Sequence, residues 1–175
     1  KNITRTKWHS FNDWPEWQQL DKCGHLYTSY TIGQVGHDLL RWSGVNKNTS
    51  IAVGGSLGFV YLMGLELLDA QAQEWGFSWS DLGANALGSG LFIAQQFLWD
   101  EQRFIVKFST HPTPYAQYRP DLLGDQFLTR LLKDYNGQTY WLSGNIHSFI
   151  KKETKFPSWL NVAFGYSATG MTGGR

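Results

Sequence analysis

The sequence has a single cysteine and few charged side chains. Cys23 stands alone among 175 residues, so no intrachain disulfide can form and no cysteine-based metal cage exists. Charged residues make up 17% of the chain, whereas an average soluble domain has roughly a quarter. The net charge of +1 comes without a dense basic patch, and we therefore expect no nucleic-acid partner.

Several motifs that would indicate a known chemistry are also missing. The sequence contains no phosphate-binding loop, HExxH or GxGxxG pattern. The mean hydropathy of −0.35 argues against a conventional polytopic membrane protein. Aromatic residues are abundant at 16%, with nine tryptophans. Low charge with many Trp and Tyr side chains is typical of a protein that rests against a membrane or a large partner, although an aromatic-rich soluble core has the same composition.

Two apolar segments carry acidic residues where a hydrophobic core would not tolerate them unpaired. In residues 51–68 Glu66 is the only charge, and Asp69 follows directly. Residues 82–99 carry no charge, and Asp81 stands immediately before them. An acid beside so much apolar surface has to be paired, protonated or bound to another group. The pattern predicts a polar cluster inside or beside an apolar helical bundle.

Small residues recur at four-residue spacing in both apolar segments. Gly54 and Gly58 share one helical face in the first segment, and Ala86, Gly90 and Ala94 share one in the second. Such faces allow helices to approach closely, as they do in lipid. Each segment would form roughly 27 Å of helix, just short of the ~30 Å hydrocarbon core. We expect a tight helical hairpin that is buried or partly inserted into a membrane.

The remaining sequence predicts a single, mainly α-helical domain over residues 1–175. Asp13 is a candidate N-cap for the first helix. The helical core is expected over about residues 13–103, as a compact hairpin or bundle. The aromatic second half, about residues 104–175, is expected to be loop-rich, with short extended segments at residues 104–108 (alternatively the end of a helix) and 139–142, and a helix at about 126–134.

Three short patterns on the predicted helices supply candidate site residues. If these helices pack together, one imidazole and several carboxylates can converge, and this set is the candidate catalytic group. The accompanying residues would form a structural polar network. The candidate catalytic residues are His25, Glu66, Asp69 and Asp81, and the network residues are Asp21, Lys22 and Asn85.

Three interpretations of this set remain open from the sequence. The group could form an acid–base pair with His25 oriented by a carboxylate. It could instead hold a divalent cation such as zinc, manganese or magnesium. Alternatively it is purely structural, with Lys22 bridging to an acid and Asp81 completing a capping box with Ser78. The sequence therefore leaves any metal or cofactor unidentified.

Six segments of the chain are similar to a known family. They are DKCGH (21–25), GLELLD (64–69), FSWSDLGANALG (77–88), WDEQR (99–103), HPTPYAQYRP (111–120) and KDYNGQTYWLS (133–143). With these segments the chain resembles the YfiM-like family of predicted periplasmic lipoproteins, especially its Bacteroidetes-type members, and more distantly VanZ-like membrane proteins. The resemblance implies an exported protein at the outer membrane or periplasmic face of a Gram-negative cell envelope, in a family without a characterised activity. Cys23 lies inside the first segment and not in a lipobox, so the mode of anchoring stays open.

Two functional hypotheses follow. The first is a non-enzymatic cell-envelope protein, associated with the outer membrane as a subunit or accessory of a membrane protein complex. The alternative is a membrane-associated hydrolase or transferase that acts on lipid or envelope glycan through the His/Glu/Asp cluster. Both hypotheses expect a membrane or a membrane-protein complex as the partner.

Overall fold

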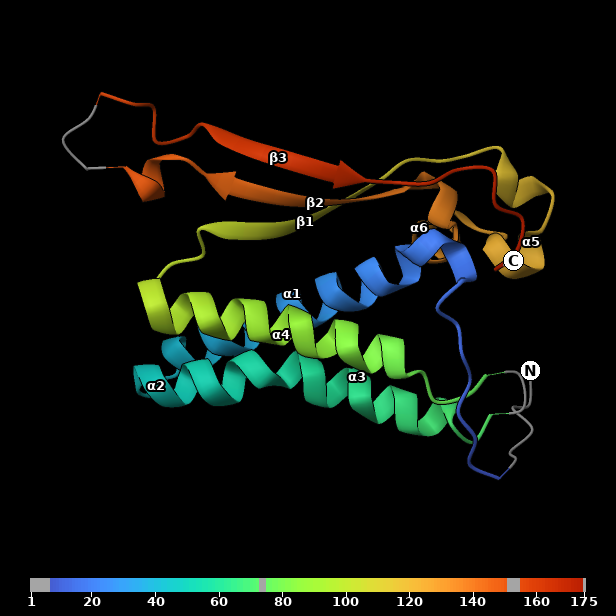
Figure 1. Cartoon of the computed structure of the whole chain (residues 1–175), viewed down its shortest axis with the longest axis horizontal. Helices are drawn as coiled ribbons and strands as arrows, with labels where there is room; N and C mark the ends of the chain where they lie inside the picture. The colour runs from blue at the N-terminus through green and yellow to red at the C-terminus, as the bar shows by residue number, and fades with distance from the viewer. Residues whose placement is uncertain (1–6, 73–74, 151–154, 175) are drawn as a thin grey trace.

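Three long helical segments and a small sheet form the two parts of the molecule. The computed structural model describes residues 7–72, 75–150 and 155–174. The long helices are α1 (Leu20–Trp42), α3 (Gly55–Asp69) and α4 (Trp79–Trp99). A short α2 (Lys47–Thr49) and a π-helical turn, η2 (Ser50–Gly54), lead directly into α3. Figure 1 shows the sheet on one side of α1 and α4, with α3 on the side away from the sheet.

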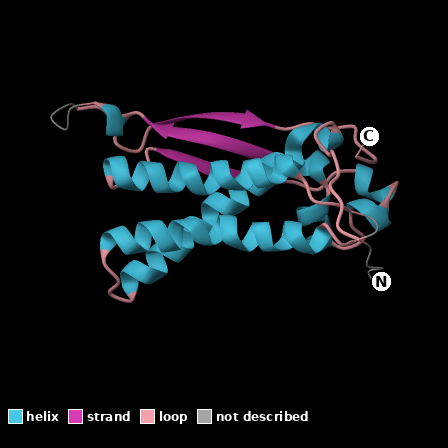
Figure 2. Ribbon diagram, turned by 60° about the horizontal axis from the view of Figure 1, so that its bottom comes forward, coloured by secondary structure: helices cyan, strands magenta, loops and turns pink. Residues whose placement is uncertain are grey.

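The sheet has three antiparallel strands in the order β1-β2-β3. The strands are β1 (Phe104–Thr110), β2 (Gln138–Asn145) and β3 (Asn161–Tyr166). Val106 pairs with Leu142, which in turn pairs with Phe164. Short helical turns fill the connections, as Figure 2 shows: η1 (Glu16–Gln19), η3 (Tyr115–Gln117), α5 (Pro120–Leu123), α6 (Phe127–Lys133), η4 (Tyr135–Gly137) and η5 (His147–Phe149).

The prediction of a mainly helical protein is confirmed, but the prediction of a loop-rich second half is incomplete. Residues 104–108 belong to a strand and not to a helix end, and residues 139–142 lie within β2. The strand β3 was not predicted. Val162, Phe164 and Tyr166 alternate with Ala163 and Gly165, which are not polar, so the segment lacks the apolar/polar alternation that identifies a strand.

Glycines bring α3 and α4 into backbone contact with α1. A Cβ on Gly58 would lie 2.1 Å from the Ser29 carbonyl oxygen, and one on Gly88 would lie 2.2 Å from the Leu26 carbonyl oxygen. Ser29 lies between them, and its buried hydroxyl donates to the Asn85 carbonyl at 2.7 Å. The small-residue face predicted for the first apolar segment is therefore a packing face.

The corresponding prediction for α4 is wrong. Ala86, Gly90 and Ala94 are exposed, and a Cβ on Gly90 would meet no atom within 4 Å. The helix instead packs through Ala84 and Gly88, which lie on the other face. Both faces of α4 have small residues at four-residue spacing, so the spacing alone could not select the correct one.

A cluster of aromatic and aliphatic side chains joins the helices to the sheet. Tyr30 of α1 and Phe92 of α4 pack edge to face with ring centroids 6.0 Å apart, and Val106 of β1 completes the buried cluster. Gln95 fixes the connection from α4 to β1, because its side chain accepts from the Phe104 amide at 2.7 Å and donates to the Phe104 carbonyl at 2.9 Å.

The surface of α3 and α4 that faces away from α1 is apolar. Among the described residues, one helical segment, Lys47–Asp69, is long and apolar enough to cross a membrane, and only 33% of its apolar window is buried. By length and composition alone this is weak evidence for a membrane span. The exposed large apolar side chains of these helices include Val53, Leu57, Val60, Tyr61, Leu67 and Leu68 of the α2–α3 segment and Leu87, Phe97 and Leu98 of α4.

Two glycines of α4 give opposite predictions for the same substitution. Gly88→Ala should destabilise the protein by about 1–3 kcal/mol, because the added methyl group overlaps the Leu26 carbonyl. Gly90→Ala should leave stability unchanged or raise it by up to ~1 kcal/mol, because its Cβ enters open space. Denaturant unfolding of both variants measures the difference, and equal effects would show that α1 and α4 do not pack in this way.

Candidate functional site

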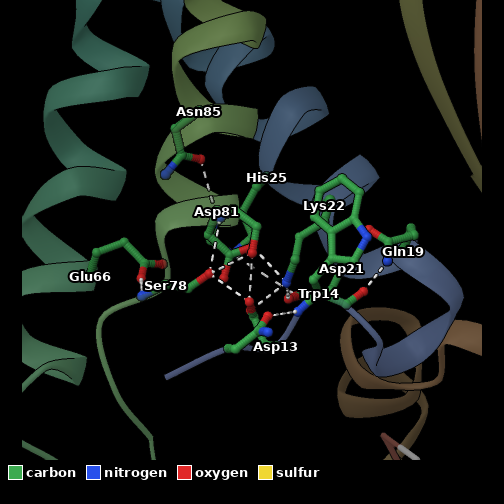
Figure 3. Close-up of polar contacts among 12 residues, drawn as sticks. Asp13, Trp14, Gln19, Asp21, Lys22, His25, Glu66, Ser78, Asp81 and Asn85 are labelled. Atoms are coloured by element: carbon green, nitrogen blue, oxygen red, sulfur yellow. Dashed lines mark hydrogen bonds and ion pairs between the residues drawn. The ribbon is translucent and has the colours of Figure 1, made fainter. Parts of the chain in front are cut away.

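The ends of the three long helices meet at one open cavity of about 510 Å³. The beginning of α1 contributes His25 and Asp21, the end of α3 contributes Glu66 and Asp69, and the beginning of α4 contributes Asp81, all of which line the cavity. The structure thus brings all four candidate catalytic residues to one space, and Figure 3 shows three of them, His25, Glu66 and Asp81. Apolar side chains from α3, the connection between α3 and α4, β1 and α6 form much of the remaining wall, namely Leu62, Leu65, Trp75, Phe108, Leu131 and Leu132.

Lys22 lies at the centre of the polar contacts beside this cavity. Its side chain is only 9% exposed, and its ammonium contacts the carboxylates of Asp13, Asp21 and Asp81, the latter two at 2.9 Å. Burial alone would lower the pKa of Lys22, but attraction to Asp21 and hydrogen bonds to the other two acids raise the pKa above its usual value. Lys22 is therefore a permanent buried cation that joins three separate parts of the chain.

Asp13, in the N-terminal segment, forms an ion pair with Lys22. It is buried, and its Oδ1 accepts from the hydroxyls of Ser78 at 2.8 Å and Ser80 at 2.6 Å. Burial would raise the pKa of Asp13, but the hydrogen bond from Lys22 and those from the serines hold it well below its usual range. The prediction of Asp13 as an N-cap is wrong, because α1 begins only at Leu20 and the Asp13 carboxylate contacts the ammonium group of Lys22 instead.

His25 lies between an amide on one side and two carboxylates on the other. Its Nδ1 lies 3.0 Å from Oδ1 of Asn85, which is fully buried. Its Nε2 lies 3.8 Å from Oδ2 of Asp81 and 4.0 Å from Oδ1 of Asp21. These separations exceed a direct hydrogen bond, so the imidazole is oriented by Asn85 and faces the acids across a gap.

Asp81 has both a structural and an electrostatic role at the start of α4. The Ser78 hydroxyl accepts from the Asp81 amide at 3.0 Å and caps the helix, as one interpretation of the sequence anticipated. The carboxylate itself is buried. Burial, together with repulsion from Asp21, raises the pKa of Asp81 to about 7, against the opposing effects of His25 and Lys22.

Glu66 and Asp69 extend the acidic wall from α3. Glu66 is buried, and its carboxylate accepts from the Ser78 amide at 3.1 Å, which ties the end of α3 to the start of α4. Burial raises the pKa of both carboxyl groups. Neither residue contacts Lys22 in the described part of the structure, so these two acids are available to a molecule in the cavity.

Two residues of the site were not found from the sequence. Asp13 matched an N-cap pattern that accounted for it locally. Tyr135, in the second half of the chain, donates its hydroxyl to Oδ1 of Asp21 at 2.7 Å. Burial, then the nearby Asp21 charge, raises the pKa of Tyr135 well above its usual value, so the hydroxyl remains a donor. No spacing rule links Tyr135 to an acid more than a hundred residues earlier.

Residues 10–96 match the family model described as "Predicted periplasmic lipoprotein (DUF2279)". The matched segment contains every residue of the cluster that comes from the helices, and Tyr135 lies outside it. The expected resemblance to predicted periplasmic lipoproteins is confirmed, and with it a location in the cell envelope. Comparison with curated proteins and with solved structures gave no match.

The central position of Lys22 makes its removal far more costly than that of an exposed lysine. Lys22→Met should lower the free energy of unfolding by about 3–5 kcal/mol, because three carboxylates lose their shared counter-charge in a buried setting. Lys47→Met is the matched control, since Lys47 pairs at 2.9 Å with Asp100 on the surface, and it should cost less than ~1 kcal/mol. Denaturant titration of both variants is the measurement, and similar losses would contradict a buried network.

Proposed function

Since the chain belongs to the family of predicted periplasmic lipoproteins, we propose that it is a cell-envelope enzyme at the periplasmic face of the outer membrane, where it hydrolyses or transfers part of a lipid. The observation that carries this proposal is the cavity itself. It combines His25, Glu66, Asp69 and Asp81 with a largely apolar wall. A substrate with a polar bond to be cleaved and an acyl chain matches both parts of the cavity.

The apolar wall favours lipid over envelope glycan as the substrate. Leucine and aromatic side chains line the cavity together with the acids, and they would gain little from a hydrated sugar. Burying an acyl chain there would contribute about 0.8 kcal/mol for each methylene group removed from water. The cluster would then face the ester bond at the polar end of the lipid.

The chemistry would be addition of water, or of an acceptor alcohol, to the acyl carbon. The incoming oxygen bonds to that carbon, the carbon–oxygen ester bond breaks, and the proton of the nucleophile passes to the leaving oxygen. Glu66 and Asp69 are suited to carry this proton, because burial raises their pKa values toward the working pH. His25 lines the same cavity and would help to position the reacting group.

The exposed face of α3 and α4 would bring the enzyme to its substrate. Between Lys47 and Asp69 the helical segment carries one charged side chain, Glu66, and that residue is buried. Exposed tryptophans stand at both ends of the bundle, Trp42 at the end of α1 and Trp79 at the start of α4. Apolar faces bordered by tryptophan are typical of proteins that sit in a lipid interface.

A second candidate function is a non-enzymatic accessory of an outer-membrane protein complex. The observation in its favour is β3, which is the edge strand of the sheet and is exposed at all six residues. Val162 and Phe164 are among its exposed apolar side chains. A strand with an unpaired edge and apolar side chains can be extended by a strand of a partner.

The catalytic proposal predicts the loss of turnover without loss of the fold. His25→Ala and Glu66→Gln should each reduce release of fatty acid from phosphatidylethanolamine–phosphatidylglycerol vesicles at least ~100-fold, as expected for a lost acid–base or substrate-contacting group. Glutamine keeps an oxygen that can accept from the Ser78 amide. Mass spectrometry of the released acids and circular dichroism of the variants are the two readouts.

The control variant is Asp38→Asn, because Asp38 also pairs with a histidine, His37, but does not line the cavity. Its turnover should equal that of the wild-type chain. If the wild-type chain binds the vesicles and releases no product from them or from isolated outer-membrane lipid, the enzymatic proposal fails and the accessory function is favoured.

The membrane-facing proposal predicts a strong effect of one charge on the apolar face. Val60→Lys should weaken binding to the same vesicles by about 100-fold, because a lysine in hydrocarbon costs roughly 2.5–3.5 kcal/mol. Lys107→Glu on the exposed side of β1 is the control and should bind normally. Vesicle flotation measures both, and unchanged flotation of Val60→Lys would exclude α3 as the lipid-facing element.

A further inference from the structure

The contact between His25 and Asn85 decides which nitrogen of the imidazole carries a proton. The acceptor at 3.0 Å from Nδ1 is the amide oxygen of Asn85, so Nδ1 donates and the neutral ring has its lone pair on Nε2. The Nδ2 group of the same fully buried amide has no hydrogen-bond partner in the described structure. An unpaired buried donor is costly, and among the described residues the Asn85 side chain makes its hydrogen bond to His25.

The Nε2 lone pair faces two carboxylate oxygens. Oδ2 of Asp81 lies at 3.8 Å and Oδ1 of Asp21 at 4.0 Å. Three electron-rich atoms directed at a common point repel one another unless a positive charge lies between them. The separations are too long for hydrogen bonds and leave room for a small ion.

Lys22 holds the two carboxylates in this arrangement from the opposite side. Its ammonium contacts Oδ2 of Asp21 and Oδ1 of Asp81, both at 2.9 Å, so each acid turns its other oxygen toward His25. When all three are ionised, Asp13, Asp21 and Asp81 carry three negative charges against the single positive charge of Lys22. The excess of two is the charge that one divalent cation would neutralise.

We propose that His25, Asp21 and Asp81 bind a divalent transition-metal cation of the zinc or manganese type. The three residues offer ligand atoms within 4.8 Å of one another, and a cation between them would lie roughly 2.2–2.5 Å from each atom, close to the ~2.0–2.2 Å typical of zinc ligands. One imidazole with two carboxylates suits zinc and manganese better than calcium or magnesium.

The partners of these ligands match the surroundings of known metal sites. A metal-bound histidine commonly donates its other ring nitrogen to an oxygen acceptor, as His25 does to Asn85. Asp21 accepts from the hydroxyl of Tyr135, and both acids contact Lys22. Asn85, Tyr135 and Lys22 are positioning residues. The site opens into the cavity, so the cation would present a free coordination position to the lipid, although cation binding itself does not depend on the proposed activity.

The test is calorimetric titration of the purified full chain in detergent, after dialysis against chelator, with Zn²⁺, Mn²⁺, Mg²⁺ and Ca²⁺ in turn. The wild-type chain should bind one Zn²⁺ or Mn²⁺. His25→Ala and Asp21→Asn should weaken this binding at least ~100-fold. His111→Ala and Asp38→Asn are the matched controls, since neither residue lines the cavity, and both should bind as the wild-type chain does.

Each outcome decides for or against the site. Absence of Zn²⁺ and Mn²⁺ binding by the wild-type chain, or equal binding by wild-type and His25→Ala, would overturn the proposal, as would binding of Mg²⁺ or Ca²⁺ alone. If circular dichroism shows that either variant is unfolded, proton NMR of the Co²⁺-loaded wild-type chain decides instead, because a ligating imidazole should give a paramagnetically shifted, exchangeable N–H signal and its absence would overturn the site. Cation binding without lipid turnover would leave the site standing and remove the proposed activity.

Discussion

A buried ammonium group with three carboxylate partners organises this end of the molecule. Lys22 joins the N-terminal segment through Asp13, its own helix through Asp21, and the start of α4 through Asp81. A lysine is rarely buried unless it is paired, and each partner here depends on that charge in turn. The positions of the N-terminal segment and of α4 relative to α1 are therefore coupled to one another, and the cavity wall that they build depends on the same contact.

The network leaves acids without a cation on the cavity side, and the site follows from that imbalance. Lys22 uses one oxygen each of Asp21 and Asp81 and leaves the other oxygen facing His25. Glu66 and Asp69 add charge from α3, and no lysine or arginine is among the described residues that line the cavity. In a purely structural salt bridge, the carboxylate oxygens would all be paired and would lie away from any cavity. The open arrangement is the physical ground for an activity proposed at this place in a cell-envelope protein.

The sequence was informative where an acid stood in an apolar helix and uninformative where a local pattern explained a residue fully. Glu66 and Asp81 could be predicted as candidate site residues because burial of an unpaired charge is expensive, and both line the cavity. Asp13 fitted a helix cap, which concealed its contact with Lys22. The small residues of α4 lie on two faces, and only the packing against Leu26 and Ser29 selects Gly88. Tyr135 and β3 depend on pairings between distant segments, which a single sequence does not encode in any local period.

The most direct measurement is a double-mutant cycle between Asp13 and Lys22. Denaturant unfolding gives the free energy of unfolding of the wild-type chain, Asp13→Asn, Lys22→Met and the double variant. The account predicts that the two single changes are strongly non-additive, with a coupling energy of about 1.5–3 kcal/mol, since both act on the same buried contact. Additivity within ~0.5 kcal/mol would mean that the N-terminal segment does not share the Lys22 charge. The network would then not organise the cavity, and the contacts from which the proposed site is argued would not hold.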